Sequence, residues 1–178
     1  MTGAGSAAGS ARKVALLAIM TALSLVLSFA ESFIPMPVPV PGLKIGLANI
    51  VIIVLLTGYG LGPVLSVSVA RSVLAAFFTG AVTSMMFSLA GGVSSCVAMW
   101  LFYRKLGLKL SLIGISIIGA LVHNSAQIVV AMLLMRDTAI LYYLPALLLF
   151  AIPAGFAVGL CGGKISPLSA GLFDWRQT

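Results

Sequence analysis

Long apolar stretches, separated by short polar or turn-forming segments, dominate the sequence. The stretches are Val14–Ile34, Ile45–Gly58, Pro63–Phe78, Val82–Tyr103, Ser111–Met135 and Ala139–Cys161. The first would form about 31 Å of helix at 1.5 Å per residue, which is long enough to cross a bilayer. The second and third are short for a full crossing, yet the GYGLGP segment between them disfavours one continuous helix. The pattern therefore predicts six transmembrane helices, of which these two are tilted or flanked by loops that dip into the protein.

The composition supports a membrane protein rather than a soluble one. Of the 178 residues, 61% are hydrophobic and 7% are charged, whereas a soluble domain carries about 25% charged residues. We expect an all-α integral membrane protein, a compact bundle of six transmembrane helices. The predicted organisation is a flexible N-terminal segment at residues 1–13, a single transmembrane domain at 14–163 and a C-terminal tail at 164–178.

Basic residues are distributed unevenly among the segments that join the apolar stretches. If the N-terminus is cytoplasmic, seven face the cytoplasm: Arg12, Lys13, Arg104, Lys105, Lys109, Lys164 and Arg176. Only Lys44 and Arg136 would face outside. Because cytoplasmic loops of membrane proteins carry an excess of Lys and Arg, both termini are predicted to be cytoplasmic. The net charge of +7 is thereby explained as a topology signal, without a nucleic-acid partner.

Several polar side chains lie where the bilayer interior is expected, and such groups are costly there unless they have partners. The residues predicted to bind a substrate are Lys44, Asn49, Arg71, His123, Asn124 and Gln127. Glu31 is the one acid expected to reach them, so a cavity built from these groups would be positive and would select an anionic small molecule. The alternative is internal satisfaction, with Arg71 paired to Glu31 and His123 bonded to an amide or a carbonyl.

The spacing within individual helices suggests two different faces on the first one. Small residues at Ala11, Ala15, Ala18 and Ala22 form one stripe, and Thr21, Ser24, Ser28 and Glu31 form another. In the fourth stretch, Ser84, Ser88, Gly91 and Ser95 form a small, polar stripe that favours close helix packing. The alanine stripe suits either packing within the bundle or docking of a partner protein. The proline-rich PMPVPVPG loop after the first helix suits either a lid over an outward-facing cavity or a rigid connection.

The strings PGLKIGLANI, FSLAGG, HNSAQ and YYLPALLL resemble the Gx transporter family, often labelled heptaprenyl diphosphate synthase component I. The resemblance covers the chain from Arg12 to about Gly163. The layout also resembles the S-components of energy-coupling factor (ECF) transporters. That resemblance implies a subunit of a bacterial-type cell membrane that binds a metabolite from outside, and is driven by a separate transmembrane coupling subunit and ATPase subunits. Ala18-x-x-x-Ala22 matches the position of their docking motif, so the resemblance implies partner docking by Ala15, Ala18 and Ala22.

The residues do not support catalysis by this chain alone. Synthesis of a prenyl diphosphate requires Mg²⁺ held by clustered carboxylates, but the three acids, Glu31, Asp137 and Asp174, are widely separated. The sequence contains no G-x-x-x-x-G-K-[ST] phosphate loop. One histidine and two cysteines do not suggest a metal site. We expect no catalytic residue, no metal and no cofactor. Two alternatives to a transport subunit are a non-catalytic membrane accessory of heptaprenyl diphosphate synthesis and a purely structural scaffold.

Overall fold

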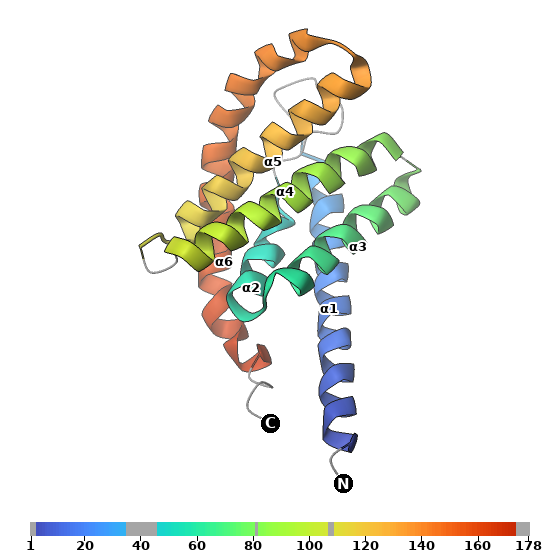
Figure 1. The fold of residues 1–178 in the computed structure, drawn as a ribbon, viewed down its shortest axis with the longest axis vertical. Coiled ribbons are helices and arrows are strands. Elements are labelled where there is room, and N and C mark those ends of the chain that lie inside the picture. The colour runs from blue at the N-terminus through green and yellow to red at the C-terminus, as the bar shows by residue number, and fades with distance from the viewer. Residues whose placement is uncertain (1–2, 35–45, 81, 107–108, 174–178) are drawn as a thin grey trace.

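The computed structural model is a bundle of helices (Figure 1). It describes residues 3–34, 46–80, 82–106 and 109–173. The α-helices are α1 (Gly3–Glu31), α2 (Asn49–Gly58), α3 (Leu61–Thr79), α4 (Val82–Leu106), α5 (Leu112–Met135) and α6 (Leu144–Phe173), with a 3₁₀ helix η1 (Thr138–Tyr143) before α6. The described residues contain no strand, and the predicted all-α class is confirmed.

Five of the helical segments are long and apolar enough to cross a membrane. The sixth, α2, has 10 residues, which corresponds to about 15 Å, or half of a bilayer core. The chain is a multi-pass membrane protein whose described residues form six α-helices, but α2 does not cross the bilayer as a full-length helix. The apolar stretch predicted to form it is correspondingly short.

The short helix α2 lies at the centre of the bundle. Val51–Leu56 are each at most 3% exposed, on every side of the helix. Their neighbours in the core come from α3, α4, α5 and α6, among them Val67, Met99, Ile115 and Val158. Non-helical backbone at membrane depth is tolerated where protein surrounds it. The central position of α2 therefore accounts for how a half-length helix can exist in this fold.

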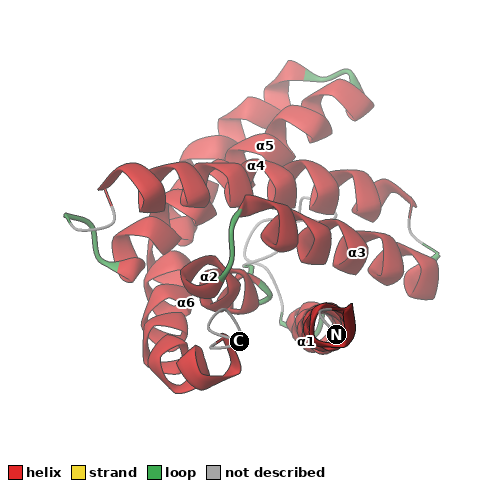
Figure 2. Ribbon diagram, turned by 60° about the horizontal axis from the view of Figure 1, so that its bottom comes forward, coloured by secondary structure: helices red, strands yellow, loops and turns green. Residues whose placement is uncertain are grey.

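The remaining helices follow one another as neighbours in the order α1, α3, α4, α5 and α6, and α2 contacts α6, α3, α1 and α5. Figure 2 shows α2 between α6 and the start of α3, with α1 viewed along its axis. The crossing of α5 and α6 is especially close. A Cβ atom added to Gly155 would lie 2.7 Å from the Ile117 Cα, and one added to Gly159 would lie 2.6 Å from the Ile113 Cα. Glycines four residues apart thus allow the two backbones to touch.

The helix boundaries differ from the predicted ones at both ends of the chain. The helix α1 begins at Gly3, so residues 3–13, predicted to be flexible, are helical. Alanine, arginine and lysine in this segment are good helix formers, and the helix therefore extends beyond its apolar part. The last helix continues to Phe173, nine residues beyond the predicted start of the tail at 164, and the predicted sixth stretch begins as the 3₁₀ helix η1.

The start of α1 and the end of α6 lie at the same end of the bundle (Figure 1). The Thr57 and Ser166 hydroxyls lie 2.7 Å apart there, so α2 ends beside the last part of α6. The Lys13 Nζ lies 5.9 Å from the centre of the Tyr59 ring at the same end. We call this the basic end, because it carries Lys13, Arg104, Lys105, Lys109 and Lys164.

Candidate ligand-binding site

The two stripes predicted on α1 face in different directions. Ser24, Ser28 and Glu31 are at most 5% exposed, whereas the alanine stripe of Ala15, Ala18 and Ala22 is exposed. The polar face of α1 therefore lies in the interior as predicted, whereas the described helices do not bury the alanine face, so the alternative of packing within the bundle is not observed there. The outer face is available to lipid or to another protein, and docking itself stays a prediction.

Glu31 connects the end of α1 to the backbone that precedes α2. Its carboxylate accepts hydrogen bonds from the backbone N–H groups of Gly46 and Leu47, the latter at 3.1 Å. Gly46 has a φ of +94°, which favours glycine, and a Cβ atom there would lie 2.9 Å from the Asn49 Nδ2. The predicted ligand residue Asn49 therefore packs against the turn that leads into α2. Lys44, the other predicted residue nearby, lies outside the described residues.

Arg71 is buried at the interface of α1, α3 and α4, with 5% of its surface exposed. Its Nη1 donates a hydrogen bond of 3.1 Å to the Ser28 hydroxyl. Its Nε has no hydrogen-bond partner among the described residues. The Glu31 carboxylate interacts electrostatically with this guanidinium, so the pairing of Arg71 with Glu31 stays an alternative prediction.

Two consecutive glycines on α4 leave room for polar side chains from the neighbouring helices. A Cβ atom on Gly92 would lie 2.6 Å from the Ser68 Oγ and 3.4 Å from the Arg71 Nη2. A Cβ atom on Gly91 would lie 2.8 Å from the His123 Cε1 and 3.0 Å from the Gln127 Cγ. Arg71 therefore approaches α4 from α3, while His123 and Gln127 approach the same level from α5. We call these groups around Gly91–Gly92 the polar layer.

The polar layer contains further atoms without partners. Gln127 is 1% exposed, and neither its Oε1 nor its Nε2 has a hydrogen-bond partner among the described residues. Outside this layer, the buried hydroxyls of Ser24 on α1 and Ser95 on α4 also have no hydrogen-bond partner among the described residues. An unsatisfied buried polar group costs about 1–3 kcal/mol. Water, a ligand or a change in packing would reduce that cost.

Asn124 does not face the polar layer. Its Nδ2 donates a hydrogen bond of 3.3 Å to the Leu147 carbonyl of α6. The structure thus brings Arg71, His123 and Gln127 to one level of α4, but directs Asn124 to α6 and places Asn49 at the start of α2. Helical spacing alone could not indicate this separation, because periodicity defines a face of a helix and not the neighbour that the face meets.

A groove between α1 and α3 lies directly beside Arg71. It has a volume of about 340 Å³ and is lined by Leu25, Val26, Ser28, Phe29, Ser32, Ala75, Phe78 and Thr79. Ser28 belongs both to this groove and to the hydrogen bond with Arg71. The groove is therefore a route by which a molecule could approach the guanidinium, while the polar layer itself is closely packed.

Sequence reasoning did not single out Gly92 or the role of Ser28 as the partner of Arg71. Gly92 lies in the FSLAGG string, and Ser28 lies in the polar stripe of α1. The signal for Ser28 was its spacing with Ser24 and Glu31. Gly92 offered no comparable signal, because a glycine in an apolar helix can have several structural roles.

The described residues contain no group of three or more His, Cys, Asp and Glu side chains that could hold a metal ion. The Asp137 carboxylate accepts a hydrogen bond of 2.8 Å from the Ala139 N–H and begins η1. Both acids in the described chain thus have contacts with backbone N–H groups. The third acid, Asp174, lies outside the described residues.

Comparisons with known proteins place this arrangement in a family. The family model described as heptaprenyl diphosphate synthase component I matches residues 20–165. A solved structure of the S component of a bacterial ECF transporter is similar in fold, with a TM-score of 0.65 and 16% sequence identity over 93% of this chain and 99% of that chain. No curated protein matches the sequence. The chain belongs to the heptaprenyl diphosphate synthase component I family and has an S-component-like fold.

Proposed function

We propose that this member of the family is the substrate-binding membrane subunit of a transporter for a small anionic metabolite, energised by separate coupling and ATPase subunits. The observation that carries the proposal is Arg71. Its guanidinium is buried in the bundle, keeps one N–H without a partner in the described chain, and lies behind a groove lined by Ser28.

The proposed role of Arg71 follows from electrostatics. A guanidinium in a bilayer costs several kcal/mol unless an anion or strong acceptors meet it, and a hydroxyl supplies only one such contact. A carboxylate or phosphate can take two parallel hydrogen bonds from arginine. We assign Arg71 as the anchor for the anionic group. On binding, the ligand would replace the Ser28 hydroxyl as the acceptor of the hydrogen bond from Arg71.

The remaining predicted residues would complete the site. His123 and Gln127 would supply directional hydrogen bonds from the α5 side of the polar layer, and Lys44 and Asn49 would contribute from the segment before α2. Asn124 would take part only if its bond to the Leu147 carbonyl opens. Because Gly91 and Gly92 are closely packed, binding would require α4 to shift against α3 or α5.

Mass spectrometry of small molecules released from gently purified protein tests this function. We expect one anionic metabolite in near-stoichiometric amount with the wild-type protein and much less with Arg71→Gln. The matched control is Lys164→Gln, which removes a positive charge from the exposed surface of α6. A neutral or cationic metabolite, retained equally by all three proteins, would contradict the proposal.

The proposed coupling subunit would dock on the alanine stripe of α1. Its three side chains are small and exposed, and small residues let the backbones of two helices approach closely in lipid. Ala18→Leu combined with Ala22→Leu should abolish co-purification with a transmembrane coupling subunit and leave the bound metabolite in place. Leu23→Met, at an exposed position of α1 outside the alanine stripe and outside the groove, is the control. Unchanged co-purification of the double variant would exclude this docking surface.

The proposed orientation places the basic end and both termini in the cytoplasm. Single cysteines can test it in a protein that lacks Cys96 and Cys161. Cysteine at Arg136, an exposed residue after α5, should react with an impermeant thiol reagent added to intact cells, and cysteine at Lys109 should not. The reverse labelling pattern would invert the topology.

The family description favours a second candidate, a non-catalytic membrane accessory of heptaprenyl diphosphate synthesis. In that case a soluble, Asp-rich synthase should co-purify with the protein, and its product should be retained at the membrane. The two candidates predict different partners, so one affinity purification under mild conditions discriminates between them.

A further inference from the structure

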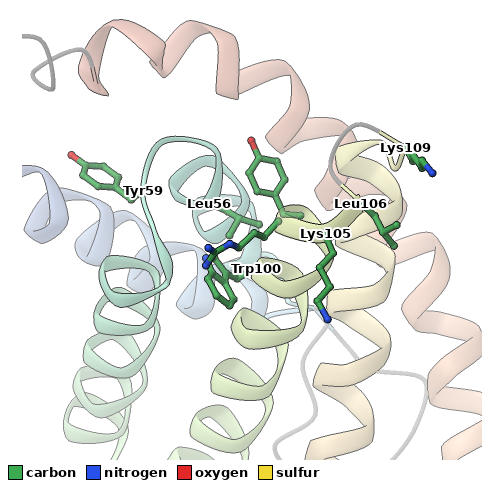
Figure 3. Close-up of a pocket in the computed structure, with 8 residues that line it drawn as sticks. Leu56, Tyr59, Trp100, Lys105, Leu106 and Lys109 are labelled. Atoms are coloured by element: carbon green, nitrogen blue, oxygen red, sulfur yellow. The ribbon is translucent and has the colours of Figure 1, made fainter.

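The basic end contains a hollow of about 590 Å³ that the proposed function does not use. Figure 3 shows Leu56 and Tyr59 on one side of it and Lys105, Leu106 and Lys109 toward the other. Tyr59 directly follows the last residue of α2, and Lys109 lies in the turn after α4. The hollow is thus formed where α2, α4 and the α4–α5 connection meet.

The walls of this hollow combine aromatic rings with positive charge. The Arg104 Cζ lies 5.3 Å from the centre of the Trp100 ring, and the Lys13 Nζ lies 5.9 Å from that of Tyr59. Lys105 and Lys109 add two exposed ammonium groups. Among the described residues no carboxylate lines the hollow. An anion from outside the described chain would therefore balance its charge.

A smaller hollow of about 250 Å³ adjoins the first along α4. It is lined by Leu101, Phe102, Lys105 and Leu106, and the last two residues line both hollows. Leu101 and Phe102 are 39% and 36% exposed on the surface of a membrane-spanning helix. A basic, aromatic hollow at the helix end thus continues into an apolar one that faces the lipid chains.

We propose that these two hollows bind one anionic phospholipid. Its phosphate lies among Arg104, Lys105 and Lys109, and one acyl chain follows Leu101 and Phe102. Basic residues at the ends of transmembrane helices attract anionic headgroups, and aromatic rings favour the same depth of the membrane. A soluble phosphate compound would occupy only the first hollow, because it has no acyl chain to fill the second. An acidic protein segment would likewise have no apolar chain for the second hollow. The continuity of the two favours a lipid.

Native mass spectrometry of the delipidated full-length protein tests the site. We expect the first molecule of dioleoylphosphatidylglycerol to bind at least tenfold more tightly than dioleoylphosphatidylcholine, which has no net charge. Arg104→Gln with Lys105→Gln should weaken phosphatidylglycerol binding by about fivefold for each charge removed. Lys164→Gln, which removes a charge from the same end outside the hollow, should leave the affinity unchanged. Elution as a single folded species verifies that each variant is intact.

Four results would overturn the proposal. Equal affinity for the two lipids would show that the headgroup charge is not recognised, and equal losses in Lys164→Gln would show a general surface potential instead of a site. Displacement of the lipid by millimolar glycerol phosphate would identify a soluble phosphate compound as the ligand. Unchanged lipid binding by the Arg104→Gln and Lys105→Gln protein, together with loss of a co-purifying subunit, would assign the hollow to a protein partner.

Discussion

The polar layer and the basic end contain similar kinds of side chain but accommodate them in different ways. In the polar layer, Arg71, His123 and Gln127 are at most 5% exposed and pack against two glycines of α4. At the basic end, Arg104 and Lys105 are exposed and border a hollow. Burial makes each polar contact in the first region specific and costly to lose, whereas water and headgroups can satisfy the second. Polar residues in a membrane sequence therefore indicate an unusual environment, but they do not by themselves indicate an open cavity.

Substitution of the α4 glycines should have the largest effect on stability, and would test whether the polar layer is as closely packed as described. The added side chain in Gly92→Leu would overlap Ser68 and Arg71, and we expect a loss of about 3 kcal/mol or more in the free energy of unfolding. Gly62→Leu is the control, because a Cβ atom there meets nothing within 4 Å. Chemical unfolding in detergent provides the measurement. Equal stability of the two variants would mean that the layer has spare room.

Loss of the Glu31 carboxylate should have the second-largest effect on the free energy of unfolding. Glu31→Ala leaves the Gly46 and Leu47 N–H groups without their acceptor, and hydrogen bonds to charged groups contribute about 1.5–3 kcal/mol. We expect a loss of about 3 kcal/mol for Glu31→Ala and about half of that for Glu31→Gln, which keeps one acceptor oxygen. Unfolding in detergent again gives the comparison. A destabilisation below about 0.5 kcal/mol in both variants would show that the turn before α2 does not depend on this carboxylate.

Asn124 offers a smaller test within the buried region. Asn124→Ala removes the hydrogen bond to the Leu147 carbonyl and should cost about 1 kcal/mol. Ser125→Ala, at the next position of α5, has a hydroxyl bonded within its own helix and serves as the control. If Asn124→Ala instead increased stability and abolished metabolite binding, the side chain would belong to the ligand rather than to α6.

The basic end should be the most tolerant region. Arg104→Gln with Lys105→Gln is expected to change the free energy of unfolding in detergent by less than about 1 kcal/mol, because exposed charges contribute little and an exposed cation–π contact, such as that of Arg104 with Trp100, contributes about 0.5–1 kcal/mol. A loss comparable with that of Gly92→Leu would remove the distinction between the two regions and show that the fold depends on these cations.

Much of the fold could be predicted from hydrophobic length and turn residues. The six apolar stretches correspond to the six α-helices, and the break between α2 and α3 falls at Tyr59 and Gly60, within the predicted GYGLGP segment. The extension of α1 to Gly3 was missed because apolar length measures the membrane core and not the helix. The central burial of α2 also required the structure, since an apolar stretch looks the same whether lipid or protein surrounds it.

The site could be predicted less completely. Spacing correctly indicated that Ser28 and Glu31 face the interior together, and that His123 and Gln127 share a face of α5. It could not indicate that Arg71 and His123 approach neighbouring glycines of α4 from two different helices, because that depends on which helices are neighbours. Neither hollow at the basic end was foreseen, since a hollow results from the relative positions of side chains on separate helices.

The affinity of Arg71 variants for the anionic metabolite identified by mass spectrometry tests the central claim most directly. Isothermal titration should show the wild-type protein binding most tightly and Arg71→Lys more weakly, because lysine supplies a point charge in place of two directed hydrogen bonds. Arg71→Gln should lose about 2 kcal/mol, or about 30-fold in Kd, while Lys105→Gln at the basic end should match the wild type. Full affinity in Arg71→Gln would contradict the account and leave Arg71 as a structural residue bonded to Ser28.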